Sequence, residues 1–311
     1  MKRISSRKRL KMRELIYLIL GVCIFTGLLF ISMKNIFWFG AYTVLCISFV
    51  IYAVYENSTL RIKNLVIESH KISSDFENMK IIFFADIQMD YFYTKNRKKI
   101  RKIVNFINQE KPDVILFGGD YINKARGTEA VFEELELLKA EKGIYSVYGN
   151  HDYYDYKKIT SRLKDLGIHI LKNDSIKLVT ENGSIVIAGI DDYLRGEPDA
   201  EKALGNSGGN FTVLLCHNPD YFEIMPKEAK EKADIILSGH THGGQLNLFG
   251  FAPFVPSRYG SKYRYGLKET ENGRIYISSG LGGVVFPMRF MAKPEIVNLI
   301  LRKKRIPDNR K

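Results

Sequence analysis

Five short polar clusters, spread along the 311-residue chain, follow apolar runs that have the composition of buried β-strands. The clusters are residues 86–88, 119–120, 149–152, 216–218 and 239–245. They supply carboxylate, amide and imidazole groups, which are the ligands that hard and borderline divalent cations accept. The chain is therefore expected to fold so that several strand ends meet at one polar, metal-binding site.

The part of the chain from residue 58 to about residue 150 alternates strand-like and helix-like patterns. Residues 80–85, 114–117 and 144–148 are short, continuous apolar runs, as in strands that are buried on both faces. Residues 95–110 and 129–140 have the apolar spacing of amphipathic helices. This β-α-β-α-β order predicts a parallel sheet, with the polar clusters gathered where its strands end.

The second half contains more strands and fewer helices. The predicted strands are 184–189, 211–216, 235–238, 274–278 and 296–301. We expect them to form a second sheet that packs face to face with the first, with helices on the outside. Such packing brings the last two polar clusters over the first three, although periodicity alone does not establish it.

Two apolar runs precede this body. Residues 15–33 and 36–55 contain no charge, and only Lys34 and Asn35 separate them. Each run is long enough for a helix to cross a bilayer. We therefore predict two transmembrane helices within 15–56, a basic segment at 1–14, a single domain at 57–301 and a basic tail at 302–311. A buried hairpin of a soluble protein is the alternative.

The net charge of +13 is concentrated at the two ends of the chain. Residues 1–13 contribute +7 and residues 302–311 contribute +5, so the part between them is nearly neutral. Neither arm has aromatic residues among its charges, which argues against nucleic-acid binding. Basic ends that flank an apolar segment suit the anionic cytoplasmic leaflet of a membrane.

The charge before the first apolar run also predicts the orientation. Positive residues keep the N-terminus in the cytoplasm, and two crossings return the chain there. We expect a multi-pass protein of the cell membrane whose folded domain is cytoplasmic. Residues 6–11 (SRKRLK) faintly resemble a twin-arginine export signal without its arginine pair, so export of the domain to the outer side is the alternative. The three cysteines form no disulfide framework, in agreement with a reducing compartment.

The clusters, in their order, resemble the motifs of the calcineurin-like metallophosphoesterases, which run DxH, GD, GNH[DE], H and GHxH. The resemblance covers about residues 78–301. Residues 238–245 (SGHTHGGQ), with 256–260, 265–267, 279–282 and 287–290, are similar to a branch of small bacterial enzymes. That branch includes membrane-associated phosphodiesterases and a UDP-2,3-diacylglucosamine pyrophosphatase. The resemblance implies an α/β fold, a four-layer αββα sandwich with two divalent metal ions between its sheets.

The resemblance also implies the roles of individual residues. Seven side chains would be metal ligands: Asp86, Gln88, Asp120, Asn150, His217, His240 and His242. Asp120 would bridge the two ions, which would polarise the phosphoryl oxygens and lower the pKa of a bridging water. His151 would lie against the phosphate and protonate or stabilise the leaving oxygen. Asp152 would orient His151 through a hydrogen bond.

The first motif departs from the family pattern, because Gln88 stands where the family usually has histidine. A carboxamide oxygen is a weaker and harder ligand than imidazole, so we expect the first ion to be manganese or magnesium. Zinc, iron and cobalt remain alternatives. Manganese-dependent ADP-ribose and CDP-alcohol diphosphatases resemble this chain in carrying DIQ at this position. We therefore interpret Gln88 as a variation of the site.

Two further features bear on the substrate. Arg258, Arg264 and Arg289 are candidates for binding a second phosphate, since guanidinium groups pair bidentately with phosphate; ordinary surface or structural roles are the alternative. Phe249, with the other apolar residues of 249–255, could receive a lipid tail or enter a membrane surface. Packing of this loop against the sheet is the interpretation that the sequence favours.

Together these patterns predict a membrane-anchored phosphohydrolase that cleaves a phosphodiester or diphosphate bond through a metal-bound hydroxide. Anchoring favours a lipid or nucleotide-lipid diphosphate, such as UDP-2,3-diacylglucosamine, as the substrate. A phosphodiesterase acting on soluble nucleotides is one alternative. A catalytically silenced metal-binding scaffold protein is another. We expect no nucleic-acid partner, and nothing in the sequence indicates an obligate protein partner.

Overall fold

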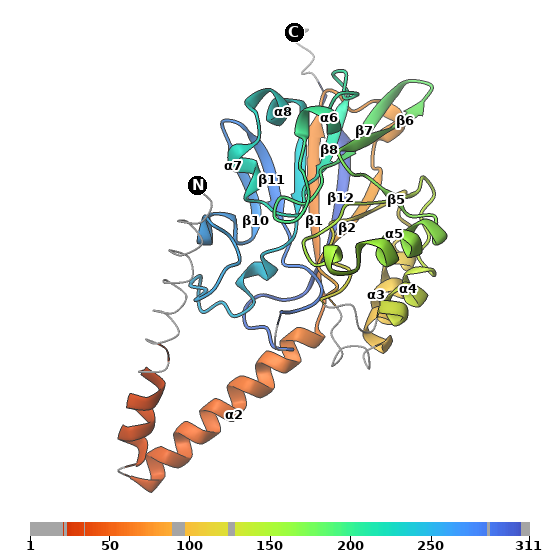
Figure 1. Cartoon of the computed structure of the whole chain (residues 1–311). Coiled ribbons are helices and arrows are strands. Elements are labelled where there is room, and N and C mark those ends of the chain that lie inside the picture. Colours follow the sequence, from red (N-terminus) through yellow and green to blue (C-terminus); the bar gives the residue numbers. More distant parts are fainter. Residues whose placement is uncertain are drawn as a thin grey trace.

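The computed structural model describes residues 21, 24–33, 35–88, 97–123, 128–284 and 287–305. Helix α2 (Ile36–Ser58) projects from one end of an α/β domain (Figure 1). Residues 24–33 form a shorter apolar helix before it. The predicted basic segment 1–14, and residues 15–20 and 22–23 of the predicted first span, lie outside the described residues.

Among the described residues, the first sheet has six strands. Their order is β1 (Arg61–Ser69), β12 (Glu295–Lys303), β2 (Lys80–Phe84), β3 (Val114–Phe117), β4 (Ile144–Ser146) and β5 (His169–Ile170). Strands β2 to β5 are parallel, as the β-α-β-α-β pattern predicts. β12 is antiparallel to β2 and parallel to β1.

The position of β12 corrects one prediction. Residues 296–301 were expected in the second sheet, but they lie between β1 and β2 in the first, where Val297 pairs with Phe83. β1, which the sequence patterns did not indicate, needs β12 as its hydrogen-bonding neighbour. The last strand therefore returns to the sheet in which the domain begins.

The second sheet, as far as the chain is described, also has six strands. Their order is β10 (Gly266–Thr270), β11 (Gly273–Ile277), β9 (Ile235–Ser238), β8 (Phe211–Leu215), β7 (Gly183–Gly189) and β6 (Asp174–Thr180). The four central strands match the predicted ones to within a residue at each end. Both edge strands, β6 and β10, are antiparallel to their neighbours and are half-exposed, so their apolar signal in the sequence is weak.

The two sheets pack face to face, and alternation within single strands explains why. In β2, Ile81 and Phe83 belong to the core between the sheets, together with Val213 and Leu237 of the second sheet. The intervening residues of β2 point to the outer face, where helices cover them. Strands that are apolar on both faces in this way require two covering layers.

Helices provide those outer layers. α3 (Arg97–Gln109), α4 (Thr128–Leu135) and α5 (Tyr156–Asp165) cover the first sheet. α6 (Ala200–Ala203), α7 (Tyr221–Ile224) and α8 (Lys227–Lys232) cover the second. The predicted αββα sandwich is thus confirmed. Short 3₁₀ segments lie at η1 (Ser74–Phe76), η3 (Asp152–Asp155), η4 (His242–Gly244) and η5 (Gly260–Tyr263).

The C-terminal end of α2 is attached to the domain by hydrogen bonds. The Arg289 N–H donates to the Ala53 carbonyl at 2.9 Å, and the Ala292 N–H donates to the Glu56 carboxylate at 2.8 Å. β12 begins only a few residues later and runs antiparallel to β2. The C-terminal end of β2, where the first polar cluster follows, therefore lies at the end of the sandwich that carries α2.

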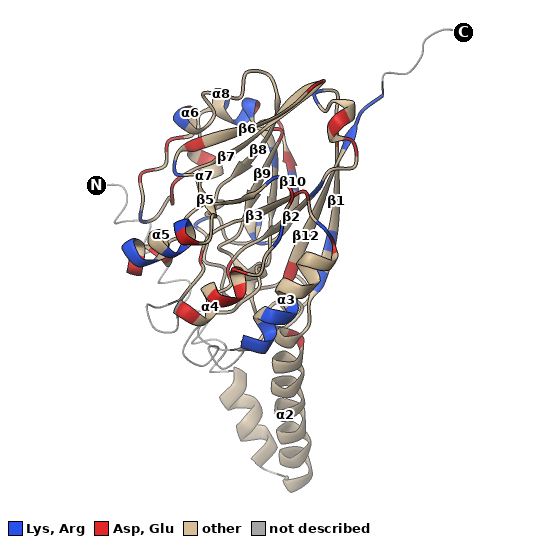
Figure 2. Cartoon of the chain, turned by 90° about the vertical axis from the view of Figure 1, so that its right-hand side faces the viewer, with Lys and Arg blue, Asp and Glu red and all other residues tan. Residues whose placement is uncertain are grey.

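The described part of the basic tail, residues 302–305, lies at the opposite end of the domain from α2 (Figure 1). β12 separates the two ends by about 26 Å, from its nine residues at 3.3 Å per step. The expectation that the tail shares a membrane surface with the apolar helices is not supported. Helix α3, rich in lysine and arginine, lies instead beside the end of α2 (Figure 2). Residues 306–311 lie outside the described residues.

Candidate metal centre

Most of the predicted ligands adopt an unusual backbone conformation. Asp86, Gln88, Asp120, His240 and His242 have φ values between 39° and 71°, in the left-handed region. Residues other than glycine are uncommon there and cluster at functional sites. In each case the chain turns sharply just after a strand. Interlocking backbone bonds hold these turns, since the Asp86 N–H donates to the Gly119 carbonyl at 2.9 Å and the Gln88 N–H to the Asp120 carbonyl at 3.1 Å.

Asp120 lies at the centre of the site. Ligand atoms of Asp120, His217 and His240 lie within 4.8 Å of one another, and all three side chains are buried. One carboxylate oxygen of Asp120 accepts the backbone N–H of His151 at 2.8 Å. The other accepts the Gln88 side-chain amide at 2.6 Å and lies 3.4 Å from His217 Nε2. The structure thus brings together residues from all three polar clusters of the first half and from both clusters of the second.

Four buried side-chain atoms in this site have no hydrogen-bond partner among the described residues: Gln88 Oε1, Asn150 Oδ1, His217 Nε2 and His242 Nδ1. Buried polar atoms in folded proteins are nearly always paired. Each of the four is an electron-pair donor of the kind that binds divalent cations. Gln88 uses its nitrogen on Asp120, which leaves its oxygen as the free ligand atom. The residues therefore fit metal ions.

The histidine rings are oriented by backbone groups behind them. His217 Nδ1 lies 2.7 Å from the Gly118 carbonyl, so Nδ1 carries the proton and Nε2 faces Asp120. The His240 ring hydrogen-bonds to the backbone of Pro256. Such outer contacts set the tautomer and angle of a metal-binding imidazole.

The charges of the site are strongly coupled. Burial raises the pKa of Asp86 to about 7, with the neighbouring charge of His217 acting in the opposite direction. Burial would lower the pKa of His217, but the Asp120 carboxylate outweighs it and raises this pKa to about 10. His240 has its pKa lowered to about 3 by burial and by the charge on His217. The raised pKa of His217 means that the Asp120 carboxylate favours a positive charge beside it, a role that a divalent ion can also fill.

Asp152 does not form the predicted hydrogen bond to His151. Its carboxylate accepts the backbone N–H groups of Asp120 at 2.8 Å, Tyr121 at 2.9 Å and Gly149 at 2.8 Å. His151 Nδ1 lies 3.0 Å from the backbone carbonyl of Asn123. The prediction is wrong because Asp152 is directed at the two neighbouring turns. It joins the second and third clusters, while a carbonyl orients His151.

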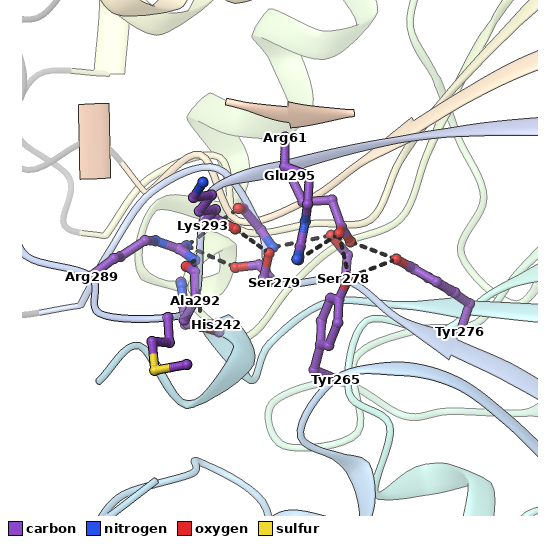
Figure 3. A network of polar contacts seen from close by, with 12 residues as sticks. Arg61, His242, Tyr265, Tyr276, Ser278, Ser279, Arg289, Ala292, Lys293 and Glu295 are labelled. Carbon is purple, nitrogen blue, oxygen red and sulfur yellow. Dashed lines mark hydrogen bonds and ion pairs between the residues drawn. The ribbon is translucent and has the colours of Figure 1, made fainter. Parts of the chain in front are cut away.

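Arg289 is the second correction among the predicted site residues. Its side chain is fully buried, and its guanidinium donates to the carbonyls of Ala292 and Ser279, both at 2.7 Å, and from Nε to Gly282 at 2.9 Å (Figure 3). It also reaches the carbonyl of His242 at 3.5 Å. A guanidinium surrounded by backbone carbonyls cannot bind a substrate phosphate. Arg289 instead holds the loop of a predicted metal ligand against the turn at 279–282.

Figure 3 also shows how the sheets are joined beside this loop. The buried Glu295 carboxylate accepts the hydroxyls of Tyr265 at 2.7 Å and Tyr276 at 2.8 Å, and Arg61 pairs with it at 2.8 Å. Arg61 and Glu295 belong to the first sheet, and Tyr276 belongs to the second. This polar cluster therefore ties the two sheets together at the end of the sandwich that carries α2.

The other two predicted arginines are differently placed. Arg264 is half-buried; its carbonyl accepts the Thr241 hydroxyl at 2.7 Å, and its Nη1 has no hydrogen-bond partner among the described residues. Arg258 is exposed, and its guanidinium lies over the Tyr193 ring at 5.6 Å. Both remain candidates for contact with the substrate.

Three buried acidic residues that support the site were not predicted. Asp192 follows β7, and burial raises its pKa to about 6 against the opposing charge of His217. Its neighbour Asp191 accepts the hydroxyl of Tyr153. Asp220 accepts the Ser257 hydroxyl at 2.5 Å, next to the proline that holds His240. The signal was present in the sequence, since Gly-Ile-Asp-Asp and His-Asn-Pro-Asp also follow apolar runs.

Comparison with known proteins agrees with this geometry. Residues 79–244 match the family model of the calcineurin-like phosphoesterases. The uncharacterized metallophosphoesterase YkuE of Bacillus subtilis is 36% identical over 245 residues, which cover 76% of this chain and 83% of that protein. An uncharacterized metallophosphoesterase of Helicobacter pylori is 32% identical over 283 residues, covering 88% of this chain and 72% of that protein. A zebrafish (Danio rerio) transmembrane protein with a metallophosphoesterase domain is 29% identical over 260 residues, covering 78% and 57%.

The chain belongs to the calcineurin-like phosphoesterases. It is a metal-dependent phosphoesterase, as the sequence motifs predicted. The family is dinuclear, and the buried cluster around Asp120 is the candidate for its metal centre.

Proposed function

We propose that this chain is a membrane-anchored phosphohydrolase that cleaves a phosphodiester or diphosphate bond of a lipid-linked substrate at the membrane surface. The observation that carries the proposal is the position of the candidate metal centre at the end of the sandwich where α2 joins the domain. Lys99 illustrates the proximity, because its ammonium group donates to the Asn57 carbonyl of α2 at 2.7 Å and to the Leu281 carbonyl at 3.3 Å. The Leu281 N–H in turn donates to the carbonyl of Ala85, next to Asp86, at 3.0 Å.

The seven predicted ligands would hold two divalent ions. Manganese is our first choice, because two carboxamides, two carboxylates and three imidazoles form a mixed and rather hard donor set. When bound, such ions polarise the phosphoryl oxygens and lower the pKa of a water, which supplies the nucleophile near neutral pH.

Residues of the chain carry the remaining roles. His151 Nδ1 is directed at the Asn123 carbonyl, so Nε2 is the ring atom that can hold a proton for the leaving oxygen. The backbone of His151 is tied to Asp120 at 2.8 Å, which fixes the proton donor relative to the metal ligands. Arg264, beside the 240–244 loop, is the first candidate to bind a second phosphate of a diphosphate substrate.

Membrane anchoring rests on α2. The helix has 23 residues, about 34 Å at 1.5 Å per residue, which is enough to cross a hydrocarbon core of ~30 Å. Its only charged residue is Glu56, which is buried against the domain, while Trp38, Val44 and Ile51 are exposed. The apolar helix at 24–33 supports a second crossing. The basic α3 beside the end of α2 supports a cytoplasmic domain.

The reaction is tested by manganese-dependent hydrolysis of bis(p-nitrophenyl) phosphate by the detergent-purified chain. Asp120→Asn is the control, because it weakens the residue at the centre of the ligand cluster. We expect turnover that requires metal and is lost in the variant. Folded protein without turnover in manganese, magnesium, zinc or cobalt would favour the silenced scaffold.

The substrate class is tested by comparing a nucleotide-lipid diphosphate, such as UDP-2,3-diacylglucosamine in mixed micelles, with soluble ADP-ribose and a cyclic dinucleotide. We expect the lipid-linked substrate to have the highest kcat/KM. A preference for either soluble compound would replace the lipid proposal by the soluble-nucleotide alternative. Neither result affects the assignment of the metal centre, since all these substrates use it.

The membrane side is tested with Lys303→Cys, at the end of the domain farthest from α2. A membrane-impermeant maleimide should label this cysteine only after the cells are opened. Labelling in intact cells would instead support an exported domain.

A further inference from the structure

The loop that follows the 239–245 cluster exposes its apolar side chains. Phe249 is 84% exposed, Phe251 54% and Leu248 52%. Residues 245–257 contain no charged residue. The sequence favoured packing of residues 249–255 against the sheet. Val255 is buried, but the three phenylalanines of this segment are exposed, so this prediction is wrong. We call residues 246–254 the apolar loop.

The tip of the apolar loop is a tight hairpin. The Leu248 N–H donates to the Phe251 carbonyl at 2.7 Å, and the Phe251 N–H donates back at 2.9 Å. The two residues between them, Phe249 and Gly250, have φ values of 48° and 98°. A two-residue hairpin with positive φ at both positions normally has asparagine or aspartate before glycine. A bulky aromatic residue is strained there, so its presence at the exposed tip is better explained by a contact outside the domain than by the turn.

The base of the apolar loop is attached to the metal centre on one side. It follows directly on η4, which contains His242. A side chain at Gly244 would come within 2.5 Å of Ala252, so the loop packs closely on the turn of the predicted ligands. A surface or molecule that binds the apolar loop therefore lies next to the candidate metal centre.

On its other side the apolar loop is attached to α2 through Phe290. Leu246 forms a β-bridge with Phe290, and the Asn247 N–H donates to the Phe290 carbonyl at 2.8 Å. The Phe290 ring lies 5.0 Å from Phe49 and 5.5 Å from Tyr52, both on α2. The adjacent Met291 is 45% exposed and extends the apolar surface.

These contacts define the level of the apolar loop relative to a membrane. Phe49 and Tyr52 lie about 20–24 Å along α2 from Ile36, its first residue. If a hydrocarbon core of ~30 Å begins at Ile36, both residues lie inside it. The exposed apolar surface of α2 is thus continuous with that of the loop, and the basic α3 lies at the same end of the domain (Figure 2). This continuity identifies a lipid surface, rather than a second protein, as the occupant.

We propose that the apolar loop inserts into the same bilayer as α2, with Phe249 at its tip, and holds the metal centre at the lipid headgroup level. The inference rests on the proposed membrane anchoring and adds a second attachment to it. With two attachments, α2 and the apolar loop, the tilt of the domain relative to the bilayer is fixed. A phosphate linked to a lipid then reaches the site while its acyl chains remain in the bilayer.

The test uses the fluorescence of single tryptophans in the full chain, reconstituted in phosphatidylcholine vesicles with and without acyl-chain bromine, which quenches tryptophan on contact. The chain has one tryptophan, Trp38, so Trp38→Phe gives a silent background. Phe249→Trp places the probe at the hairpin tip. Val179→Trp, at an exposed position of β6, is the matched control far from α2. Hydrolysis of bis(p-nitrophenyl) phosphate verifies that each variant is folded.

We expect a blue-shifted emission and a loss of intensity in brominated vesicles for the Phe249→Trp variant, and neither for the Val179→Trp variant. Equal responses of the two variants would overturn the inference, as would shielding of the hairpin-tip probe that depends on protein concentration and indicates a second copy. Native Trp38 is measured separately, and its lack of quenching would contradict the anchoring itself. If Phe249→Trp is inactive, Phe251→Trp provides the same readout on the other side of the turn.

Discussion

At the residue scale, the candidate metal centre consists of side chains that are presented by a strained backbone. Five predicted ligands have positive φ, and a non-glycine residue in this region costs of order 1–3 kcal/mol. The surrounding turns offset this cost through bonds such as those from three backbone N–H groups to Asp152. Glycines at 149 and 239 leave the space that the carboxylates of Asp120 and Asp86 occupy.

Gly149→Ala tests this dependence on space. A methyl group at position 149 would overlap the Asp120 carboxylate and lie 2.5 Å from its backbone nitrogen. We expect metal affinity to fall by roughly 10–100-fold, as when a residue that supports a metal ligand is lost, although no ligand itself is changed. Calorimetric titration with manganese measures the effect. Gly205→Ala, where the nearest atom is 3.4 Å away, is the control, and equal affinities for the two variants would refute the argument.

Gln88→Ala tests whether the free carboxamide oxygen is a ligand. Removal of this oxygen should weaken one of the two metal-binding events by roughly 10–100-fold and leave the other nearly unchanged. Gln88→His should restore binding and shift the preference toward zinc, because imidazole is a softer donor. Metal content and competitive titrations measure both effects. Two ions bound with native affinity by Gln88→Ala would remove this residue from the ligand set.

At the element scale, α3 and α4 are joined by a charged contact that involves one buried carboxylate. Glu134 of α4 is fully buried and accepts Arg97 Nε at 2.5 Å and Arg101 Nη2 at 2.9 Å, both from α3. The two arginines are half-exposed, so solvent reduces the strength of each pair. The contact holds the basic α3 in its position beside the end of α2.

Glu134→Gln should lower the free energy of unfolding by about 1–3 kcal/mol at pH 7. The hydrogen bond to Arg101 is the main cause that lowers the pKa of Glu134 in the folded chain. A carboxylate with a lowered pKa stabilises above its unfolded pKa, near 4.3, and loses this contribution as the pH falls further. The difference between variant and wild type should therefore shrink below about pH 4.

Denaturant unfolding followed by circular dichroism at several pH values measures this difference. Glu136→Gln, at an exposed position of the same segment, is the matched control and should have little effect. A loss of stability for Glu134→Gln that is the same at all pH values would point to packing and not to charge.

At the scale of the whole molecule, the domain has two distinct ends. The α2 end has the candidate metal centre, the apolar loop and α3, whereas the other end has residues 302–305 of the basic tail. Membrane attachment through α2 would place the first end at the bilayer and direct the second away from it. The proposed anchor and the site that the substrate must reach therefore lie at the same end of the domain.

Energy transfer to a headgroup-labelled lipid tests this orientation. A donor dye on Lys98→Cys, in α3, should transfer efficiently, and the same dye on Lys303→Cys should transfer weakly, because β12 alone adds about 26 Å of separation. The chain is reconstituted in vesicles at a low protein-to-lipid ratio. Equal efficiencies at the two positions would mean that the domain lies on its side or is free to rotate.

The amino-acid sequence was enough to predict the chemistry of the site and the class of the fold. Local apolar patterns predict the strands before Asp86 and Asp120. The residue types that can act as ligands follow from the elementary chemistry of divalent cations. The central strands could be predicted for this reason, whereas the αββα layers were expected because the motifs resemble those of a known family. Edge strands β6 and β10 could not, because half-exposed residues leave a weak pattern.

Which groups from distant parts of the chain meet could be learned only from the three-dimensional fold. Three features join segments that are far apart in the sequence, and local patterns cannot predict them. They are the place of β12 in the first sheet, the three backbone N–H groups that donate to Asp152, and the backbone carbonyls that accept from Arg289. The apolar loop is exposed because no other part of the described domain covers it, and its sequence is equally compatible with burial. Side-chain type follows from the residue itself, but a hydrogen-bond partner or a covering surface is chosen by contacts between distant parts of the chain.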